Sequence, residues 1–329
     1  MRRTATMMSM LLFLGSIAFR GLSAQTRSAP RATNQSPLSR MPDGRPDFQG
    51  VWSFGTLTPL ERSKEFADKP FLTDAEAAEF VQRQLEAANA DTQPTANYNE
   101  FWFERPGSVV RLDGRNLTSR IIDPPDGRIP PLTREAQARV DALQKARREH
   151  AADDPEIRSR PERCLSATPL GFEPAGGGTN NFVQVVQTSE HLVLFAELMS
   201  GLRIIPVTAG KHPSGSIRSP FGDSRARWDG DSLVVDTTNY SGRFDFTFLG
   251  ADEHLHVTER FRLVDADTLL QQATIDDQTA FTRTWTVVLS MHRTRARMFE
   301  FACHEGNYAL KHILAGARME EAERSRDRR

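Results

Sequence analysis

The second half of the chain consists of short runs in which apolar residues are continuous or alternate with polar ones. Turn residues separate the runs, which span residues 182–187, 191–198, 202–207, 225–228, 232–237, 254–264, 268–275, 281–291 and 297–303. In residues 281–291 an apolar row alternates with a row of threonines, which is the period of a half-buried strand. Closely spaced strands without helices between them predict a mainly β fold: an antiparallel barrel or strongly curled sheet, calycin-like in outline.

The first half of the chain has a different pattern. Residues 73–90 and 133–150 place apolar side chains on one face at helical spacing, and Thr73 with Glu76 forms a capping box at the first of these helices. Asp113-Gly114 between two apolar runs predicts a hairpin, since this pair tolerates the positive φ of a tight turn. We therefore expect a smaller irregular region with two helices and a hairpin, packed on the sheet.

The amino terminus has the features of a signal peptide. Arg2 and Arg3 form a basic start, residues 7–19 are apolar, and Leu22-Ser23-Ala24 is a plausible cleavage site. We expect an exported, periplasmic or extracellular protein with no membrane insertion after cleavage. The predicted organisation is a signal peptide at 1–24, a disordered tether at 25–41, the helical and irregular region at 42–175, the antiparallel β domain at 176–310 and a C-terminal helix or frayed tail at 311–329.

Charge and motifs exclude several functions. The formal net charge is −1, and basic and acidic residues are interspersed, which argues against a nucleic-acid partner. Gly176-Gly177-Gly178 lacks the lysine of a phosphate loop, and no Gly-x-Ser-x-Gly motif of a serine hydrolase occurs. We predict no cofactor.

The two cysteines, Cys164 and Cys303, are far apart in the sequence. In an exported protein they predict one disulfide bond. The alternative is a catalytic thiol at Cys303, beside His304, although no sequence context activates it.

Several motifs lie along nearly the whole mature chain: PDFQGVW at 46–52, LTPLER at 57–62, DPPDG at 123–127, GDSR at 222–225, WDGDSLVVDTT at 228–238, HVTERF at 256–261 and ACHEGNY at 302–308. They resemble the motifs of a large family of uncharacterised secreted proteins from soil and environmental bacteria. The resemblance implies a bacterial, extracytoplasmic protein, and it implies no established activity.

Glu259 is the first candidate for chemistry. Strict alternation places it in an apolar row with Val257 and Phe261, where a carboxylate must be paired, protonated or exposed to a cavity. Two interpretations stay open. Glu259 forms a buried ion pair with an arginine such as Arg283, or it is a cavity carboxylate with a raised pKa that acts as a general acid or base.

His254 and His256 would share one face of a strand and could chelate a metal, as in barrels of the cupin type. The spacing to Glu259, and the sequence His304-Glu305-Gly306-Asn307, do not fit the cupin pattern. We therefore predict no metal site and regard the two histidines as weak candidates, with exposed surface histidines as the alternative.

Residues at the entrance of the 225–237 hairpin form the second constellation. Asp223 either closes a turn or, with Arg225 and Trp228 at a barrel mouth, contacts a polar ligand that has a flat face. Arg283 and Trp285 are further candidates for ligand binding, and Trp285 is equally well explained as a core residue.

Taken together, the sequence favours an exported binding protein whose barrel-type cavity holds a small, partly apolar molecule. A second hypothesis is an acid-base enzyme, such as an isomerase, cyclase or hydrolase, that uses Glu259 with Asp223 or His304. A third is an interaction module of the cell envelope that docks through the aromatic group near Trp102.

Overall fold

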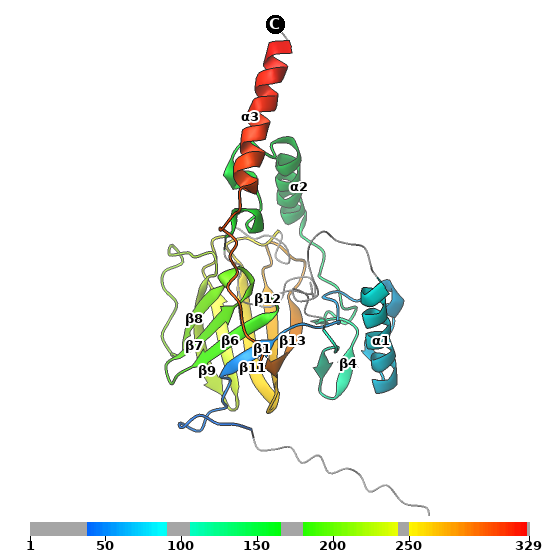
Figure 1. The fold of residues 1–329 in the computed structure, drawn as a ribbon. Coiled ribbons are helices and arrows are strands. Elements are labelled where there is room, and N and C mark those ends of the chain that lie inside the picture. Colours follow the sequence, from blue (N-terminus) through cyan, green and yellow to red (C-terminus); the bar gives the residue numbers. More distant parts are fainter. Residues whose placement is uncertain (1–37, 91–105, 166–179, 243–249, 328–329) are drawn as a thin grey trace, which may run out of the picture. The chain divides into compact units, whose positions relative to one another are not determined.

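The computed structural model describes residues 38–90, 106–165, 180–242 and 250–327, all within one compact unit (Figure 1). The predicted signal peptide, most of the predicted tether, the aromatic group near Trp102 and Gly176-Gly177-Gly178 lie outside the described residues.

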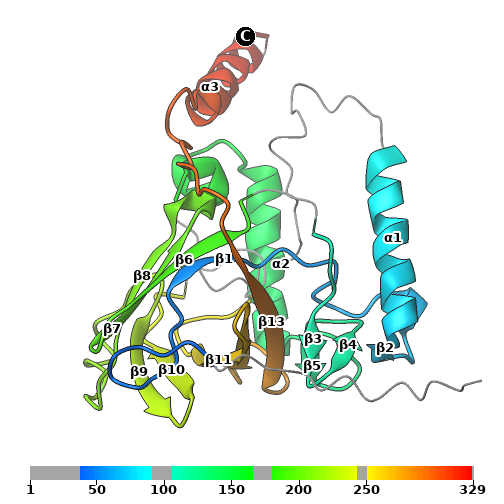
Figure 2. The same ribbon diagram turned by 60° about the horizontal axis from the view of Figure 1, so that its bottom comes forward.

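Ten strands form the main sheet, and every strand pairing in it is antiparallel (Figures 1 and 2). In hydrogen-bonded order they are β8 (Leu202–Pro206), β7 (His191–Ala196), β6 (Phe182–Gln187), β1 (Gly50–Ser53), β13 (Trp285–Thr294), β12 (Thr268–Asp276), β11 (His256–Asp265), β10 (Ser232–Thr238) and β9 (Asp223–Asp229), with β5 (Ile121–Asp123) also paired to β13. The expected mainly β, antiparallel fold is confirmed.

Among the described residues, the backbones of the two edge strands of this sheet, β8 and β9, meet in a single bridge. Val207, directly after β8, forms an isolated parallel bridge with Ala226, and Thr208 N donates to Ala226 O at 2.9 Å. No ladder joins the two edges within the described residues, so the closed barrel that the sequence suggested is not confirmed.

Alternate side chains of the strands meet in one large apolar core. Its buried members, contributed by β1, β6–β13 and the segment before β1, are Phe48, Trp52, Val183, Val185, Leu192, Leu194, Ile205, Ala226, Leu233, Val235, Phe261, Leu263, Leu269, Leu289 and Met291. A second cluster at one end of the strands contains Trp285 and Phe281, whose rings meet edge to face. Full burial of each large apolar side chain stabilises the fold by about 1.5–3 kcal/mol.

The small sheet contains β2 (Phe71–Leu72), β4 (Arg115–Leu117) and β3 (Arg111–Leu112). Asp113 and Gly114 join β3 to β4 with φ values of 47° and 79°, the positive pair that a two-residue hairpin turn requires. The chain leaves β4 after Leu117 and reaches the main sheet as β5.

Three α-helices occur in the described part of the chain: α1 (Asp74–Ala90), α2 (Arg134–Glu149) and α3 (Ala309–Asp327). Short 3₁₀ turns are η1 (Lys64–Phe66), η3 (Pro155–Ile157), η4 (Pro161–Arg163) and η5 (Leu198–Ser200). The capping box is confirmed, since Thr73 N donates to the Glu76 carboxylate at 2.9 Å and Glu76 N donates to Thr73 Oγ1 at 3.3 Å.

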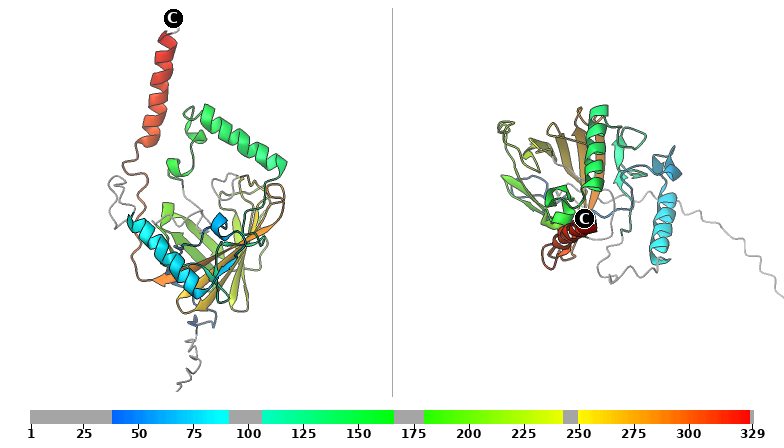
Figure 3. Two further views of the ribbon diagram at one scale, coloured as in Figure 1. Left: turned by 90° about the vertical axis from the view of Figure 1, so that its right-hand side faces the viewer. Right: turned by 90° about the horizontal axis from the view of Figure 1, so that it is seen from above.

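Helix α2 begins beside one end of the main sheet (Figure 3). Thr133 caps it and also donates through Oγ1 to Thr279 O at 2.8 Å, and Ala136 is buried in the end cluster that contains Trp285. One turn further on, Arg139 Nη2 donates to Gly250 O at 2.9 Å. The start of α2 is thus fixed to the loops that flank β11 and β13.

Two expectations for the chain ends are corrected. Residues 297–303 form no strand, because β1 pairs with the edge of β13 that such a strand would need, in the register Val51 to Thr294. Ordered structure also begins before residue 42, since Arg40 forms an ion pair with Asp231 at 2.8 Å.

Candidate functional site

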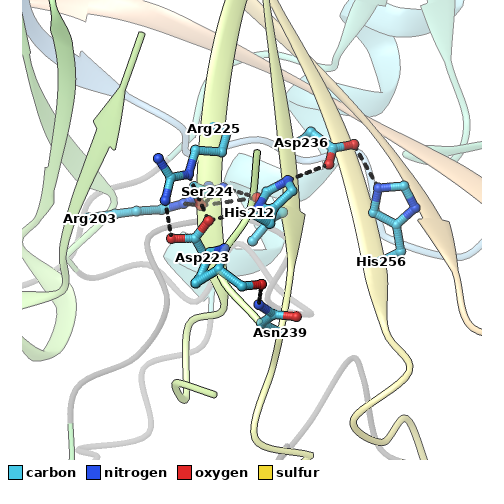
Figure 4. Close-up of polar contacts among 10 residues, drawn as sticks. Arg203, His212, Asp223, Ser224, Arg225, Asp236, Asn239 and His256 are labelled. Atoms are coloured by element: carbon cyan, nitrogen blue, oxygen red, sulfur yellow. Dashed lines mark hydrogen bonds and ion pairs between the residues drawn. The ribbon is translucent and has the colours of Figure 1, made fainter. Parts of the chain in front are cut away.

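Glu259 lies in the interior of the sheet with no exposed surface. Its Oε2 accepts a hydrogen bond from Arg203 Nη2 at 2.5 Å, and its Oε1 accepts one from Gln271 Nε2 at 2.8 Å. Arg203 also donates to the hydroxyl group of Ser224 at 2.9 and 3.1 Å (Figure 4). Its Nη2 donates to the hydroxyl group of Thr237 at 2.8 Å. The buried carboxylate is therefore paired and enclosed by protein groups.

The buried pair settles which arginine is the partner of Glu259. The sequence suggested Arg283, but that side chain is half exposed and forms an ion pair with Asp123 at 2.8 Å. Burial alone would lower the pKa of Arg203, yet the adjacent Glu259 carboxylate outweighs this effect and raises the pKa of Arg203. With no exposed surface and a hydrogen bond to each carboxylate oxygen, Glu259 matches the buried ion-pair interpretation rather than a carboxylate that faces a cavity.

The opposite face of β9, β10 and β11 carries a group of charged side chains, here called the outer polar cluster: His212, Asp223, Arg225, Asp236 and His256 (Figure 4). His212 comes from the loop between β8 and β9 and lies between two carboxylates. Its Nδ1 is 2.7 Å from Asp223 Oδ1 and its Nε2 is 2.8 Å from Asp236 Oδ1. Both contacts are hydrogen bonds only when each ring nitrogen carries a proton.

The cluster continues on both sides of His212. Arg225 Nε donates to Asp223 Oδ1 at 2.8 Å, and His256 Nε2 lies 2.7 Å from Asp236 Oδ2. Partial burial would raise the pKa of Asp223 and of Asp236, but hydrogen bonds with Arg225 and the neighbouring histidines outweigh it and hold both pKa values below the usual aspartate range. The arrangement fastens the loop before β9 to the outer face of the sheet.

Replacement of Asp236 by asparagine is expected to reduce the acid sensitivity of stability. Because the aspartate pKa values are lowered in the folded state, their contribution is complete above the ordinary aspartate pKa of about 4 and is lost as the pH falls through the lowered values. Urea midpoints measured between roughly pH 2 and pH 7 should therefore fall less steeply for Asp236→Asn than for the wild type.

The control for this measurement is Asp267→Asn, at a position whose side chain is 80% exposed. It should keep the steeper wild-type profile. Parallel profiles for the wild type and Asp236→Asn would show that the outer polar cluster contributes nothing to acid stability.

The structure does not bring the predicted catalytic residues together. Glu259 is inside the sheet, Asp223 is on its outer face, and His304 lies exposed beside the C-terminal disulfide. Within the described residues no hydrogen bond or ion pair joins Glu259 to either of the others. These three groups do not form one acid-base site.

The predicted ligand-binding residues have structural contacts instead. Arg225 belongs to the outer polar cluster, and Trp228 is half-buried with its ring centroid 5.5 Å from that of Phe48. Trp285 is fully buried, which is the core alternative. None of these three lines the cavity described below.

The two weak metal candidates also have separate partners. His254 precedes β11 and lies 2.6 Å from Asp252, whereas His256 contacts Asp236. Across the part of the chain that the structure describes, no group of three or more histidine, cysteine or acidic side chains is placed to hold a metal ion.

Cys164 and Cys303 form the expected disulfide, with their Cα atoms 5.6 Å apart. The alternative of a catalytic thiol at Cys303 is therefore wrong. The bond joins the residue directly after η4 to the segment that leads into α3, which fixes one wall of a cavity.

This cavity has a volume of about 740 Å³ and lies between α2, η3, η4 and the chain around residues 220, 242 and 251. Its polar walls are formed mainly by arginine side chains, namely Arg139, Arg147, Arg158, Arg160 and Arg163. Its apolar walls are formed by Val140, Leu143, Leu165, Pro220 and Ala251. A volume of this size falls within the range of about 300–1,000 Å³ typical of small-molecule sites.

The sequence contained a signal for this cavity that its interpretation missed. Arg139, Leu143 and Arg147 recur at intervals of four residues, so they share one face of α2. Three more arginines lie between residues 158 and 163, directly before Cys164. Because the two segments meet only in the folded chain, spacing alone could not reveal that they line one cavity.

Comparisons with known proteins found no match: no family model, no curated protein and no solved structure corresponds to this chain. The resemblance to secreted proteins of environmental bacteria thus stays a prediction. Among the described helices, none combines the length and apolar character needed to span a bilayer.

Proposed function

We propose that the protein is an exported small-molecule-binding protein, and that its ligand lies in the arginine-lined cavity beside α2. The observation that carries this proposal is the cavity itself, which has about 740 Å³ of space and walls of both apolar and charged side chains. Sites of this composition bind ligands by apolar contact and orient them with a few polar groups. Among the described lining residues, the acids Glu156 and Asp252 are already paired with Arg163 and Arg139, so binding rather than catalysis is the function we propose.

A contact between two distant strands indicates the shape of the sheet beside this cavity. β8 and β11 are six steps apart in the hydrogen-bonded order, which in a flat sheet would separate them by roughly 29 Å at the usual strand spacing. Arg203 on β8 nevertheless contacts Glu259 on β11 at 2.5 Å. We infer that the sheet curls into a barrel-like form with a filled interior, which leaves the cavity beside α2, rather than the barrel, as the place for a ligand.

Export is supported by the disulfide and by the signal-peptide pattern. Disulfide bonds persist in oxidising compartments and are rare in the cytosol, and Cys164–Cys303 is such a bond. The resemblance to secreted environmental proteins supports the same compartment.

Filling the cavity tests the binding function. Leu143→Trp would place a large ring in the space between α2 and η4, and we expect the dissociation constant of a neutral fluorescent probe, N-phenyl-1-naphthylamine, to rise at least about tenfold. Native mass spectrometry of the purified wild type and variant should show any co-purified ligand on the wild type alone.

The matched control is Gln144→Trp, on the same helix but exposed and outside the cavity lining. It adds the same side chain and should leave probe binding unchanged. If Leu143→Trp and the wild type bind the probe equally and carry the same co-purified molecules, the cavity is not a binding site.

A further inference from the structure

We infer that the ligand of the cavity beside α2 is a partly apolar anion, in which a carboxylate, phosphate or sulfate group contacts the arginine side chains and an aliphatic or ring body contacts the apolar wall. This inference rests on the proposed binding function and deepens it by naming the chemical class of the ligand.

The net positive charge of the cavity lining favours an anionic ligand. In the described part of the chain, five arginines and two acids, Glu156 and Asp252, line the cavity. Because Arg158 is also paired with Glu162 outside the lining, an excess of two positive charges remains. The two acids are already in contact with cavity arginines: Asp252 with Arg139 at 3.2 Å and Glu156 with Arg163 at 3.0 Å. Like charges around one space repel each other, so an anion at its centre would relieve that repulsion.

The guanidinium groups of the lining also suit the oxygen atoms of an anion. A guanidinium group is always charged and offers planar pairs of N–H donors that match the oxygen atoms of carboxylate and phosphate groups. Arg158 and Arg163 hold their side chains about four-fifths buried, through contacts with Glu162 and Glu156 respectively. A partly desolvated anion bound beside them is screened less by water than one on an open surface.

The apolar wall determines the other end of the ligand. Val140, Leu143, Leu165, Pro220 and Ala251 have no hydrogen-bonding side-chain group, and Val140 and Ala251 are buried. A small inorganic anion would leave the less buried of these side chains, Leu143, Leu165 and Pro220, in contact with water. A ligand with an apolar body would instead remove their surface from water, at about 25 cal/mol for each Å² covered.

Four eight-carbon compounds separate charge from apolar contact: octanoate, octyl phosphate, octanol and octylammonium. Isothermal titration calorimetry of the full chain should show the two anions binding at least about tenfold more tightly than octanol, with octylammonium weakest. Added salt should weaken the binding of the anions and leave that of octanol nearly unchanged. The stronger of the two anions identifies the head group that the site prefers.

Two variants that change the charge of the lining in opposite directions, together with one control variant, test the arginines directly. Arg147→Gln removes a positive charge from the lining and should weaken octanoate binding about tenfold, whereas Arg148→Gln removes the same charge from an exposed neighbour outside the lining and should have little effect. Glu156→Gln increases the positive excess and should strengthen octanoate binding, a gain that a misfolded variant could not produce.

Equal binding of octanol and octanoate, binding of neither anion, or an equal loss in Arg147→Gln and Arg148→Gln would each overturn the anion inference. The proposed function fails on a different result, since it requires that Leu143→Trp alters the binding of a neutral probe. A neutral ligand would therefore remove the inference about charge and leave the binding function intact.

Discussion

Replacement of Glu259 by glutamine is expected to lower the free energy of unfolding by about 3–5 kcal/mol. The substitution preserves the shape of the side chain but leaves the charge of Arg203 uncompensated inside the sheet, where that side chain is 4% exposed. Hydrogen bonds from Arg203 to Ser224 and Thr237 would remain, yet hydroxyl groups do not neutralise a buried guanidinium. Equilibrium unfolding in urea, followed by circular dichroism, gives the free energy directly.

Asp229→Asn is the matched control for this variant. Asp229 forms an exposed ion pair with Arg260, the residue that follows Glu259, at 2.8 Å. Loss of this surface pair should cost no more than about 1 kcal/mol. A double variant with Glu259→Leu and Arg203→Met should be more stable than Glu259→Leu alone, because no buried charge is left unpaired. A loss below about 1 kcal/mol for Glu259→Gln would contradict the buried pair.

The Arg203–Glu259 pair joins two strands that are not neighbours in the sheet. On β11, Glu259 lies between Val257, which belongs to the end cluster with Trp285, and Phe261, which belongs to the main core. Its partner comes from β8, which is not a neighbour of β11 in the sheet. A charge that is compensated in only one arrangement disfavours any other packing of these two strands, so we expect the pair to keep β8 and β11 close to each other.

Local patterns were sufficient to predict most strands of the sheet. The run at residues 182–187 coincides with β6, and the run at 232–237 differs from β10 by one residue. Alternation succeeds here because one face of each strand is buried and the period of two is therefore maintained. The hairpin turn at Asp113-Gly114 and the capping box at Thr73 were also predictable, since each depends on residues close in sequence.

Features that depend on distant segments were not predictable in this way. β1 and β5 are four and three residues long, too short for a periodic signal, and each is specified by its pairing with β13. Alternation placed Glu259 inside correctly, but it could not distinguish Arg203 on β8 from Arg283, which precedes β13, because both are distant from Glu259 in sequence. The cavity beside α2 was missed for the same reason.

Removal of the disulfide by Cys164→Ser together with Cys303→Ser is the second large effect we expect. The bond spans 139 residues, and closure of so long a loop restricts the unfolded chain by up to about 5 kcal/mol on the chain-entropy estimate. Measured losses for native disulfides are typically about 2–5 kcal/mol. Urea unfolding should therefore show a loss in this range, and a reducing agent should destabilise the wild type but not the double variant.

The same double substitution should also weaken ligand binding in the cavity. Such a loss would distinguish an effect of the disulfide on the folded cavity wall from an effect on the entropy of the unfolded chain alone. Arg163 and Leu165, the residues on either side of Cys164, line the cavity, and the disulfide fixes them to the segment before α3. Without that bond the wall has fewer constraints, so octanoate affinity should fall under conditions where the variant is still fully folded. Unchanged affinity in the folded double variant would mean that other contacts hold this wall, and that the disulfide acts only on the unfolded chain.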